Sequence, residues 1–201
     1  RGVEWDAVEQ PSQFMENWCY DYPTIEKVAV HHETGDKLPR ALFDKVKAAK
    51  NFRAATMMLR QLQFAVTDLQ LHSSFDPNGP VSVHEQYRAV AKEYQVMQPL
   101  PEDRFLCGFS HIFAGGYSAG YYSYKWAEVL SADCFGAFEE AGLADDDKVR
   151  ETGRRFRDTI LSLGGGEDPN EVFKRFRGRA PSPDALLRHS GLVSGHRQEL
   201  R

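Results

Sequence analysis

The sequence predicts a mainly α-helical protein. Apolar residues recur three and four positions apart through most of the 201 residues, which is the spacing of one helix face. Proline and glycine clusters interrupt these periodic stretches where helices would end. No run of alternating polar and apolar residues is long enough for a strand, and the best short candidate is residues 107–113. We therefore expect one compact multi-helix lobe.

Four helices are expected before a turn cluster at residues 75–80. The first contains Pro11, so a helix boundary or kink is expected near that residue. The second is short and is closed by Gly35. The third begins at Pro39, because the missing N–H of proline would have no partner at a helix start. The four ranges are 7–22, 22–35, 38–52 and 52–72, and the apolar face of the first consists of Val8, Pro11, Met15, Trp18 and Tyr22.

The fourth of these helices, residues 52–72, is the longest periodic stretch. Apolar and polar residues alternate along it, which indicates an amphipathic helix. The apolar set is Met58, Leu62, Phe64, Ala65, Leu69 and His72, and the polar set is Arg60, Gln61, Gln63 and Asp68.

The second half of the chain predicts three further helices and two short ones. Three consecutive glycines, residues 164–166, are a strong stop signal. Arginine and phenylalanine alternate in "RRFRD" and "FKRFRGRAP", where nearby Asp and Glu predict a salt-bridged surface rather than a nucleic-acid site. The expected ranges are 81–95, 124–142, 146–166 and two segments within 168–192.

The composition excludes several classes of protein. Lys and Arg total 25 and Asp and Glu total 29, so the net charge of −4 provides no strong field to attract nucleic acid. No apolar run approaches the roughly 20 residues that span a bilayer. The three cysteines are widely spaced, which argues against a disulfide framework and predicts a reducing compartment. The chain begins without methionine, and we expect an N-terminal part to be missing, while processing is the alternative explanation.

The stretch "HIFAGGYSAGYYSYKW", residues 111–126, combines one histidine, four tyrosines and three glycines. Core helices avoid glycine, and a buried phenol needs a partner for its O–H. Aromatic packing around a core histidine is one interpretation. The other is a binding segment, because an imidazole and phenols are suitable donors to a peptide carbonyl or a developing oxyanion. The residues that carry these groups are His111, Tyr117, Tyr121, Tyr122 and Tyr124.

Glu4 lies just before the first expected helix, and Glu9 lies in its first turn. Acidic residues at a helix start are favoured by the helix dipole, which is the ordinary interpretation. A helix-held carboxylate can also supply one ligand to zinc, which is the alternative interpretation of these acidic residues.

The zinc-peptidase motif His-Glu-x-x-His, which needs two histidines one helical turn apart, does not occur. His32-Glu33 and His84-Glu85 each lack the second histidine. We expect both pairs to be exposed helix residues.

Three long stretches carry a resemblance that covers residues 3–193. They are "VEWDAVEQPSQFMENW", "FSHIFAGGYSAGYYSYKWAEVLSADCFGAF" and "FKRFRGRAPSPDALLRHSGL", in this order. Together they resemble the C-terminal part of the thimet oligopeptidase family of zinc metallopeptidases, nearest to the oligopeptidase A branch. The resemblance implies the multi-helix C-terminal lobe of a zincin-type oligopeptidase. Residues 1–193 would be the C-terminal part of its catalytic domain and 194–201 a polar tail.

The resemblance also implies a function and its residues. The family hydrolyses peptide bonds in short peptides with one zinc ion, and a cytoplasmic location is expected. Glu9 matches the family's zinc-binding glutamate. His111, Tyr117 and Tyr124 match its catalytic and substrate-binding groups, and Gly115 and Gly116 match its substrate-binding loop.

The family's metal-binding histidines and general-base glutamate lie upstream of the first matching stretch. One carboxylate cannot make a zinc site, which needs about three protein ligands. We therefore expect the chain alone to be inactive and to need the missing N-terminal part of the same enzyme as its partner. The alternative is a non-catalytic helical peptide-binding module or half of a split enzyme. Neither nucleic acid nor a membrane is expected as a partner.

Overall fold

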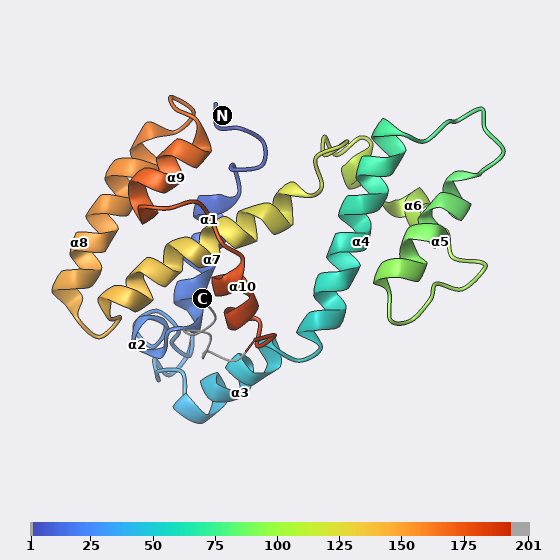
Figure 1. Cartoon of the computed structure of the whole chain (residues 1–201). Helices are drawn as coiled ribbons and strands as arrows, with labels where there is room; N and C mark the ends of the chain where they lie inside the picture. Colours follow the sequence, from blue (N-terminus) through green and yellow to red (C-terminus); the bar gives the residue numbers. More distant parts are fainter. Residues whose placement is uncertain (1, 194–201) are drawn as a thin grey trace. The chain divides into compact units, whose positions relative to one another are not determined.

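The computed structural model describes residues 2–193 (Figure 1). The expected polar tail, residues 194–201, lies outside the described residues. Where the sequence predicts one lobe, the chain divides into two compact units. Unit 1 comprises Arg1–Ala54 and Ala127–Arg201, and unit 2 comprises Ala55–Trp126.

The described residues are mainly α-helical, as predicted. Their only β feature is a single antiparallel bridge between Val30 and Lys37. A 3₁₀ turn, Trp18–Tyr20, follows α1, and a π-helical turn, Arg157–Leu161, follows α8. The helices that belong wholly or mostly to unit 1 are α1 (Gln10–Asn17), α2 (Tyr22–Ile25), α3 (Arg40–Lys50), α7 (Ser123–Ala141), α8 (Asp146–Phe156), α9 (Pro169–Arg177) and α10 (Asp184–His189). Those of unit 2 are α4 (Ala54–Ser73), α5 (Val83–Tyr94) and α6 (Phe105–Gly108), followed by a 3₁₀ turn at Ser110–Ile112.

Several helix ends lie where local sequence signals place them. Helix α1 begins at Gln10, directly before Pro11, and α3 begins after Pro39. Helix α5 starts with a complete capping box, in which Ser82 accepts from the Glu85 N–H and the Glu85 carboxylate accepts from the Ser82 N–H. These hydrogen bonds from Ser82 lower the pKa of Glu85. Helix α9 ends at Arg177 and is capped by Gly178, whose φ of +75° is readily adopted only by glycine.

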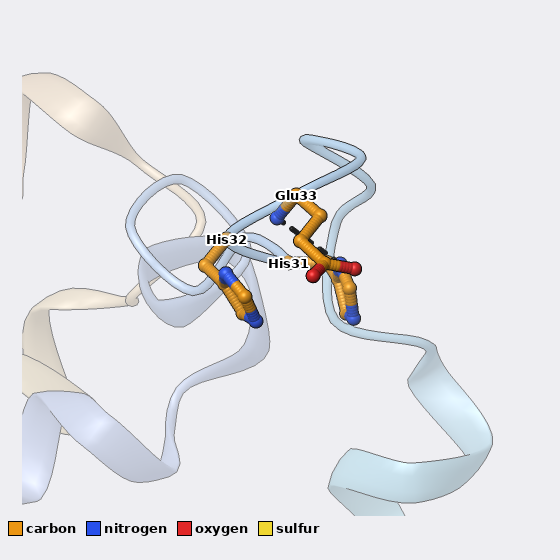
Figure 2. Close-up of side chains that lie close together, drawn as sticks. All are labelled: His31, His32 and Glu33. Carbon is orange, nitrogen blue, oxygen red and sulfur yellow. Dashed lines mark hydrogen bonds between the residues drawn. The ribbon is translucent and has the colours of Figure 1, made fainter.

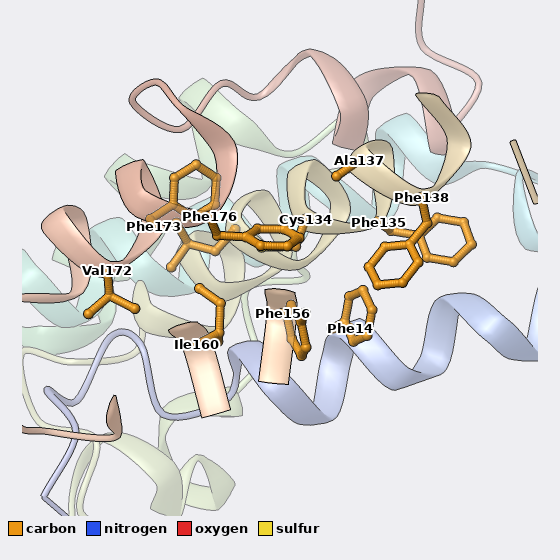
Figure 3. Packing of buried hydrophobic residues seen from close by; sticks show 11 residues of the cluster. Phe14, Cys134, Phe135, Ala137, Phe138, Phe156, Ile160, Val172, Phe173 and Phe176 are labelled. Carbon is orange, nitrogen blue, oxygen red and sulfur yellow. The ribbon is translucent and has the colours of Figure 1, made fainter. Parts of the chain in front are cut away.

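The core of unit 1 is a cluster of phenylalanines from α1, α7, α8 and α9 (Figure 3). The Phe14 ring of α1 stacks on Phe156 of α8, with centroids 4.2 Å apart, and contacts Phe138 of α7 at 5.3 Å. Aromatic rings bury the largest areas of any side chain, so this cluster holds the four helices together. The buried members are Phe14, Leu130, Cys134, Phe135, Ala137, Phe138, Phe156, Ile160, Val172, Phe173 and Phe176.

The apolar face expected for the first helix is wrong at two positions. Val8 is 41% exposed and Met15 is 59% exposed. The buried residues of α1 are instead Gln10 and Phe14, which face Cys134 and the phenylalanine cluster. The expected range of 7–22 includes a turn before α1 and a 3₁₀ turn after it, and the side of α1 that meets the core carries Phe14 rather than Met15.

Two other expected elements differ from the structure. The helix expected over residues 22–35 ends at Ile25, and the chain then turns back through the Val30–Lys37 bridge. In that turn His31 Nδ1 accepts the N–H groups of Glu33 and Thr34, so a side chain replaces the helical hydrogen bonds. Residues 107–113, expected to be extended, lie in the end of α6 and the following 3₁₀ turn.

The arginine-rich end is a salt-bridged region, as predicted. Asp133 of α7 is buried in unit 1, and both of its carboxylate oxygens accept hydrogen bonds. Arg177 Nε donates to Oδ1 at 3.0 Å, and the Arg179 guanidinium donates to both oxygens at 2.6 Å. The Ser182 N–H donates to Oδ2 at 2.9 Å, and Arg177 also forms a bidentate pair with Glu140. These contacts connect α7 to the segment that joins α9 and α10.

Cys134 is expected to resist alkylation while the chain is folded. It is fully buried in the unit 1 core, and burial raises the pKa of its thiol to about 12. The thiolate is the reactive form, so almost none is present at pH 8. Cys19 and Cys107 are exposed free thiols and serve as internal controls. Iodoacetamide followed by mass spectrometry should modify these two in the folded chain and all three in urea. Rapid labelling of Cys134 without urea would contradict the buried core.

Candidate functional site

The candidate segment of unit 2 is built around the 3₁₀ turn Ser110–Ile112. The Ser110 carbonyl accepts the Gly115 N–H at 2.7 Å, and the His111 carbonyl accepts the Tyr117 N–H at 2.9 Å. These two hydrogen bonds close residues 110–117 into a loop that includes His111. Gly116 has φ +85°, a conformation that side chains disfavour.

Gly115 is required by a close backbone approach rather than by its own conformation. A Cβ there would lie 2.7 Å from His111 Cα and 2.9 Å from the Ser110 carbonyl oxygen. Gly115→Ala is therefore expected to destabilise unit 2 by about 1–3 kcal/mol, the usual cost of overpacking. Gly108→Ala is the matched control, because a Cβ at Gly108 meets nothing within 4 Å. Urea unfolding of both variants measures the difference, and equal stability would contradict the tight loop.

The loop brings the predicted aromatic residues of unit 2 together. Tyr117 and Tyr124 stack with ring centroids 4.8 Å apart and planes 28° apart. The His111 ring lies 6.3 Å from Tyr117 and 6.1 Å from Tyr121. His111 is exposed, and the two stacked tyrosines are half-buried. An imidazole and two phenols are thus gathered within one short segment, where they can act on the same ligand.

Tyr121 connects this cluster to the core of unit 2. Its hydroxyl donates to Gln61 Oε1 at 2.9 Å, and its ring packs edge-on against Phe109 and Tyr124. Tyr121 therefore has a structural role, which is to join the segment to the core of unit 2. The buried cluster below it consists of Phe64, Tyr87, Leu106, Phe109 and Ile112.

A further residue of this region was not identified from the sequence. Asp68 of α4 is 0% exposed although the helical pattern assigns it to the polar set. Its carboxylate accepts the N–H groups of Ala119 and Tyr121, each at 2.9 Å. The only sequence signal is a charged residue one helical turn before His72, and that spacing is common on exposed helices.

Glu9, the candidate metal ligand, lies in unit 1 at the N-cap of α1. It is half-buried, and its Oε2 accepts the Ser12 hydroxyl at 3.1 Å. Such a hydrogen bond orients a carboxylate in the way that second-shell groups orient metal ligands. Glu9 could therefore supply one oxygen to a metal, and additional ligands would be needed to complete a site.

The two incomplete His-Glu motifs lie in different settings. His84-Glu85 lies in the first turn of α5, where Glu85 belongs to the capping box. His31, His32 and Glu33 lie in a turn rather than in the expected helix, and Figure 2 shows their side chains close together. One ligand atom from each lies within 4.8 Å of the others, and all three residues are exposed. Because His31 Nδ1 already accepts two backbone N–H groups, only its Nε2 remains suited to an ion.

Comparison with known proteins shows the family. The family model for peptidase family M3 matches residues 1–192. The chain is 61% identical over 194 residues to an organellar oligopeptidase A of Arabidopsis thaliana and 60% identical to a probable cytosolic oligopeptidase A of the same plant. It is 51% identical over 191 residues to oligopeptidase A of Escherichia coli. These matches cover 95–96% of this chain and 24–28% of the relatives, so the chain spans about a quarter of their length.

Within residues 2–193, no helix has both the length and the apolar composition needed to cross a bilayer.

The matching range of the family model includes Glu9, His111, Tyr117 and Tyr124. The resemblance read from the three long motifs is confirmed by the family match and by the oligopeptidase A relatives. The chain therefore belongs to peptidase family M3, the thimet oligopeptidase family, with relatives of the oligopeptidase A branch.

Proposed function

We propose that this chain is the C-terminal portion of a zinc-dependent oligopeptidase that hydrolyses short peptides. The observation that supports this most is the gathering of His111, Tyr117 and Tyr124 in a family M3 chain. Relatives named oligopeptidase A support peptides as the substrate. A cytoplasmic location is part of the proposal, supported by three free cysteines, although the relatives include both a cytosolic and an organellar enzyme.

The proposed roles follow from the chemistry of the loop. His111, Tyr117 and Tyr124 donate hydrogen bonds to substrate carbonyls and to the charge that develops on the scissile carbonyl oxygen. Gly115 and Gly116 carry no side chain, so the loop backbone can approach an extended peptide. Most of the benefit arises in the transition state, because a developing negative charge accepts hydrogen bonds more strongly than a neutral carbonyl.

Zinc would supply a Lewis acid and a source of nucleophile at neutral pH when it is bound. From this chain Glu9 would contribute one ligand, held by Ser12. About three protein ligands are required, and the sequence contains no His-Glu-x-x-His. We therefore infer that the chain alone binds no catalytic zinc and is inactive, and that the remaining ligands and the general base come from an N-terminal part of the same enzyme.

The test compares the chain alone with the complete enzyme. Zinc content by mass spectrometry and cleavage of fluorogenic short peptides should be absent from the chain. Stoichiometric zinc and cleavage are expected in the complete protein, or when the chain is mixed with a matching N-terminal part. Peptide binding without metal or cleavage in every preparation would instead identify a non-catalytic helical binding module. Cleavage by the chain alone would refute the inferred inactivity.

A further inference from the structure

Asp68 carries a full set of hydrogen bonds in the interior of unit 2. Its side chain is 0% exposed. Taking a carboxylate out of water is costly unless donors replace the lost solvent. Three donors meet it here, namely the N–H groups of Ala119 and Tyr121 at 2.9 Å and Nδ1 of His72 at 2.8 Å. The two backbone donors are more than fifty residues away along the chain, so α4 is tied directly to the candidate loop.

The two backbone bonds use different oxygens of the carboxylate. Ala119 N–H donates to Oδ1, and Tyr121 N–H donates to Oδ2. A carboxylate presents two acceptor oxygens, whereas an isosteric amide presents one acceptor and one donor. The site thus distinguishes Asp from Asn, because an Asn side-chain NH₂ would face a backbone N–H.

The anchored segment has an unfavourable backbone conformation. Ala119 has φ +54°, which is rare for a residue with a Cβ. Such conformations persist only where surrounding contacts impose them, and they occur often at functional sites. The hydrogen bond from Ala119 to Asp68 is one such contact.

The same segment lies between the two proposed donors. Gly120 N–H donates to the Tyr117 carbonyl at 2.9 Å, and Tyr124 N–H donates to the Tyr121 carbonyl at 3.3 Å. The stacked rings of Tyr117 and Tyr124 therefore extend from either side of the segment that Asp68 anchors. A shift of residues 119–121 would move one ring relative to the other.

His72 completes the environment of the carboxylate. Its Nδ1 lies 2.8 Å from Asp68 Oδ1 and 2.9 Å from the Asp68 carbonyl oxygen. Both of these partners can only accept, so Nδ1 carries the proton. The His72 ring lies 6.1 Å from Phe113, another residue of the loop.

We propose that Asp68 is a positioning residue for the candidate site. Its carboxylate fixes residues 119–121 and thereby sets the hydroxyls of Tyr117 and Tyr124 against the substrate. The catalytic part of this inference rests on the proposed peptidase function. The anchor itself is a property of the loop and can be measured without catalysis.

The anchor is tested by amide hydrogen exchange on Asp68→Asn. The Ala119 and Tyr121 amides are expected to exchange at least about tenfold faster relative to the rest of unit 2, since an amide can replace only one of the two acceptors. Val90→Ala is the matched control, because Val90 is buried in α5 of the same unit and has no part in the loop. Equal exchange at these amides in both variants would overturn the proposal. Should Asp68→Asn fail to fold, His72→Phe leaves the carboxylate in place but removes the side-chain donor that holds its orientation, so the Ala119 and Tyr121 amides are expected to exchange faster.

The catalytic consequence is tested in the complete enzyme. Asp68→Asn is expected to lower kcat by about 10²-fold with a smaller change in KM, because misplaced donors lose most in the transition state. In an enzyme that already carries Tyr117→Phe and Tyr124→Phe, the same substitution should have little further effect. If Asp68→Asn lowers kcat by the same factor in that background, Asp68 does not act through the two tyrosines, and the proposal is overturned. A wild-type enzyme that cleaves no peptide would reject the proposed function, and the exchange experiment would still decide the anchor.

Discussion

Asp133→Asn is expected to destabilise unit 1 by about 3–5 kcal/mol, the usual cost of removing one member of a buried ion-pair network. Asp133 is 1% exposed and accepts hydrogen bonds from Arg177, Arg179 and the Ser182 N–H. The Arg177 side chain is only 7% exposed, so water has little access to the Nε that loses Asp133, although the pair of Arg177 with Glu140 remains. An Asn at this position also directs an NH₂ toward donors, which adds a repulsive contact.

The surface pair Asp147–Arg150 provides the control for this prediction. Asp147 is 93% exposed and lies 3.2 Å from Arg150, so Asp147→Asn should change stability by less than about 0.5 kcal/mol. Urea unfolding, monitored by circular dichroism, gives the free energy of unfolding of both variants and of the wild type. A loss at Asp133 no larger than that at Asp147 would mean that Arg177 and Arg179 find other partners, and that the α9–α10 connection does not depend on this carboxylate.

The helical architecture was predictable because its signals are local. Pro39 before α3, the Ser82–Glu85 box of α5 and the three glycines after the π-helical turn each act within one helical turn of the chain. Such signals depend little on tertiary contacts. The helices expected over 38–52, 52–72, 81–95 and 124–142 are therefore present with shifts of a few residues at their ends.

The sequence-based expectations were wrong at places where contacts within the folded unit decide the structure. The turn at residues 31–34 depends on a hydrogen-bond acceptor, His31 Nδ1, that no propensity scale includes. Phe14 is buried and Met15 is exposed because Phe138 and Phe156 meet that side of α1. A helical pattern with apolar residues on several sides does not identify which side another helix will cover.

The residues of the candidate region also differ in whether local sequence signals could identify them. His111, Tyr117 and Tyr124 lie within fourteen residues, so a composition unusual for a core singled out their segment, and the family resemblance selected these three residues within it. Asp68 and Asp133 are buried charges, and most of their hydrogen-bond donors lie more than forty residues away along the chain. Each looks like an ordinary polar position of an amphipathic helix. The burial that gives these two residues their importance exists only after the fold has formed.

Tyr124→Phe in the complete enzyme is expected to lower kcat by about 10²–10³-fold, the usual effect of removing one hydrogen bond to a developing oxyanion. The substitution keeps the ring, which stacks on Tyr117 at 4.8 Å and packs edge-on against Tyr121 at 5.1 Å. The change therefore removes the hydroxyl while the packing of the loop is retained. Because the proposed hydrogen bond is strongest in the transition state, KM should change much less than kcat.

Tyr121→Phe separates this catalytic role from a structural one. The Tyr121 hydroxyl donates to Gln61 within unit 2, so its removal should cost about 1 kcal/mol of stability and leave kcat near the wild-type value. Steady-state kinetics with a fluorogenic peptide, together with thermal unfolding of both variants, gives the two readouts. If Tyr124→Phe leaves kcat unchanged, its hydroxyl does not act on the reacting carbonyl. If it lowers kcat only in proportion to a loss of folded protein, the stacked pair is a packing feature of the loop, and the oxyanion role would pass to His111 and Tyr117.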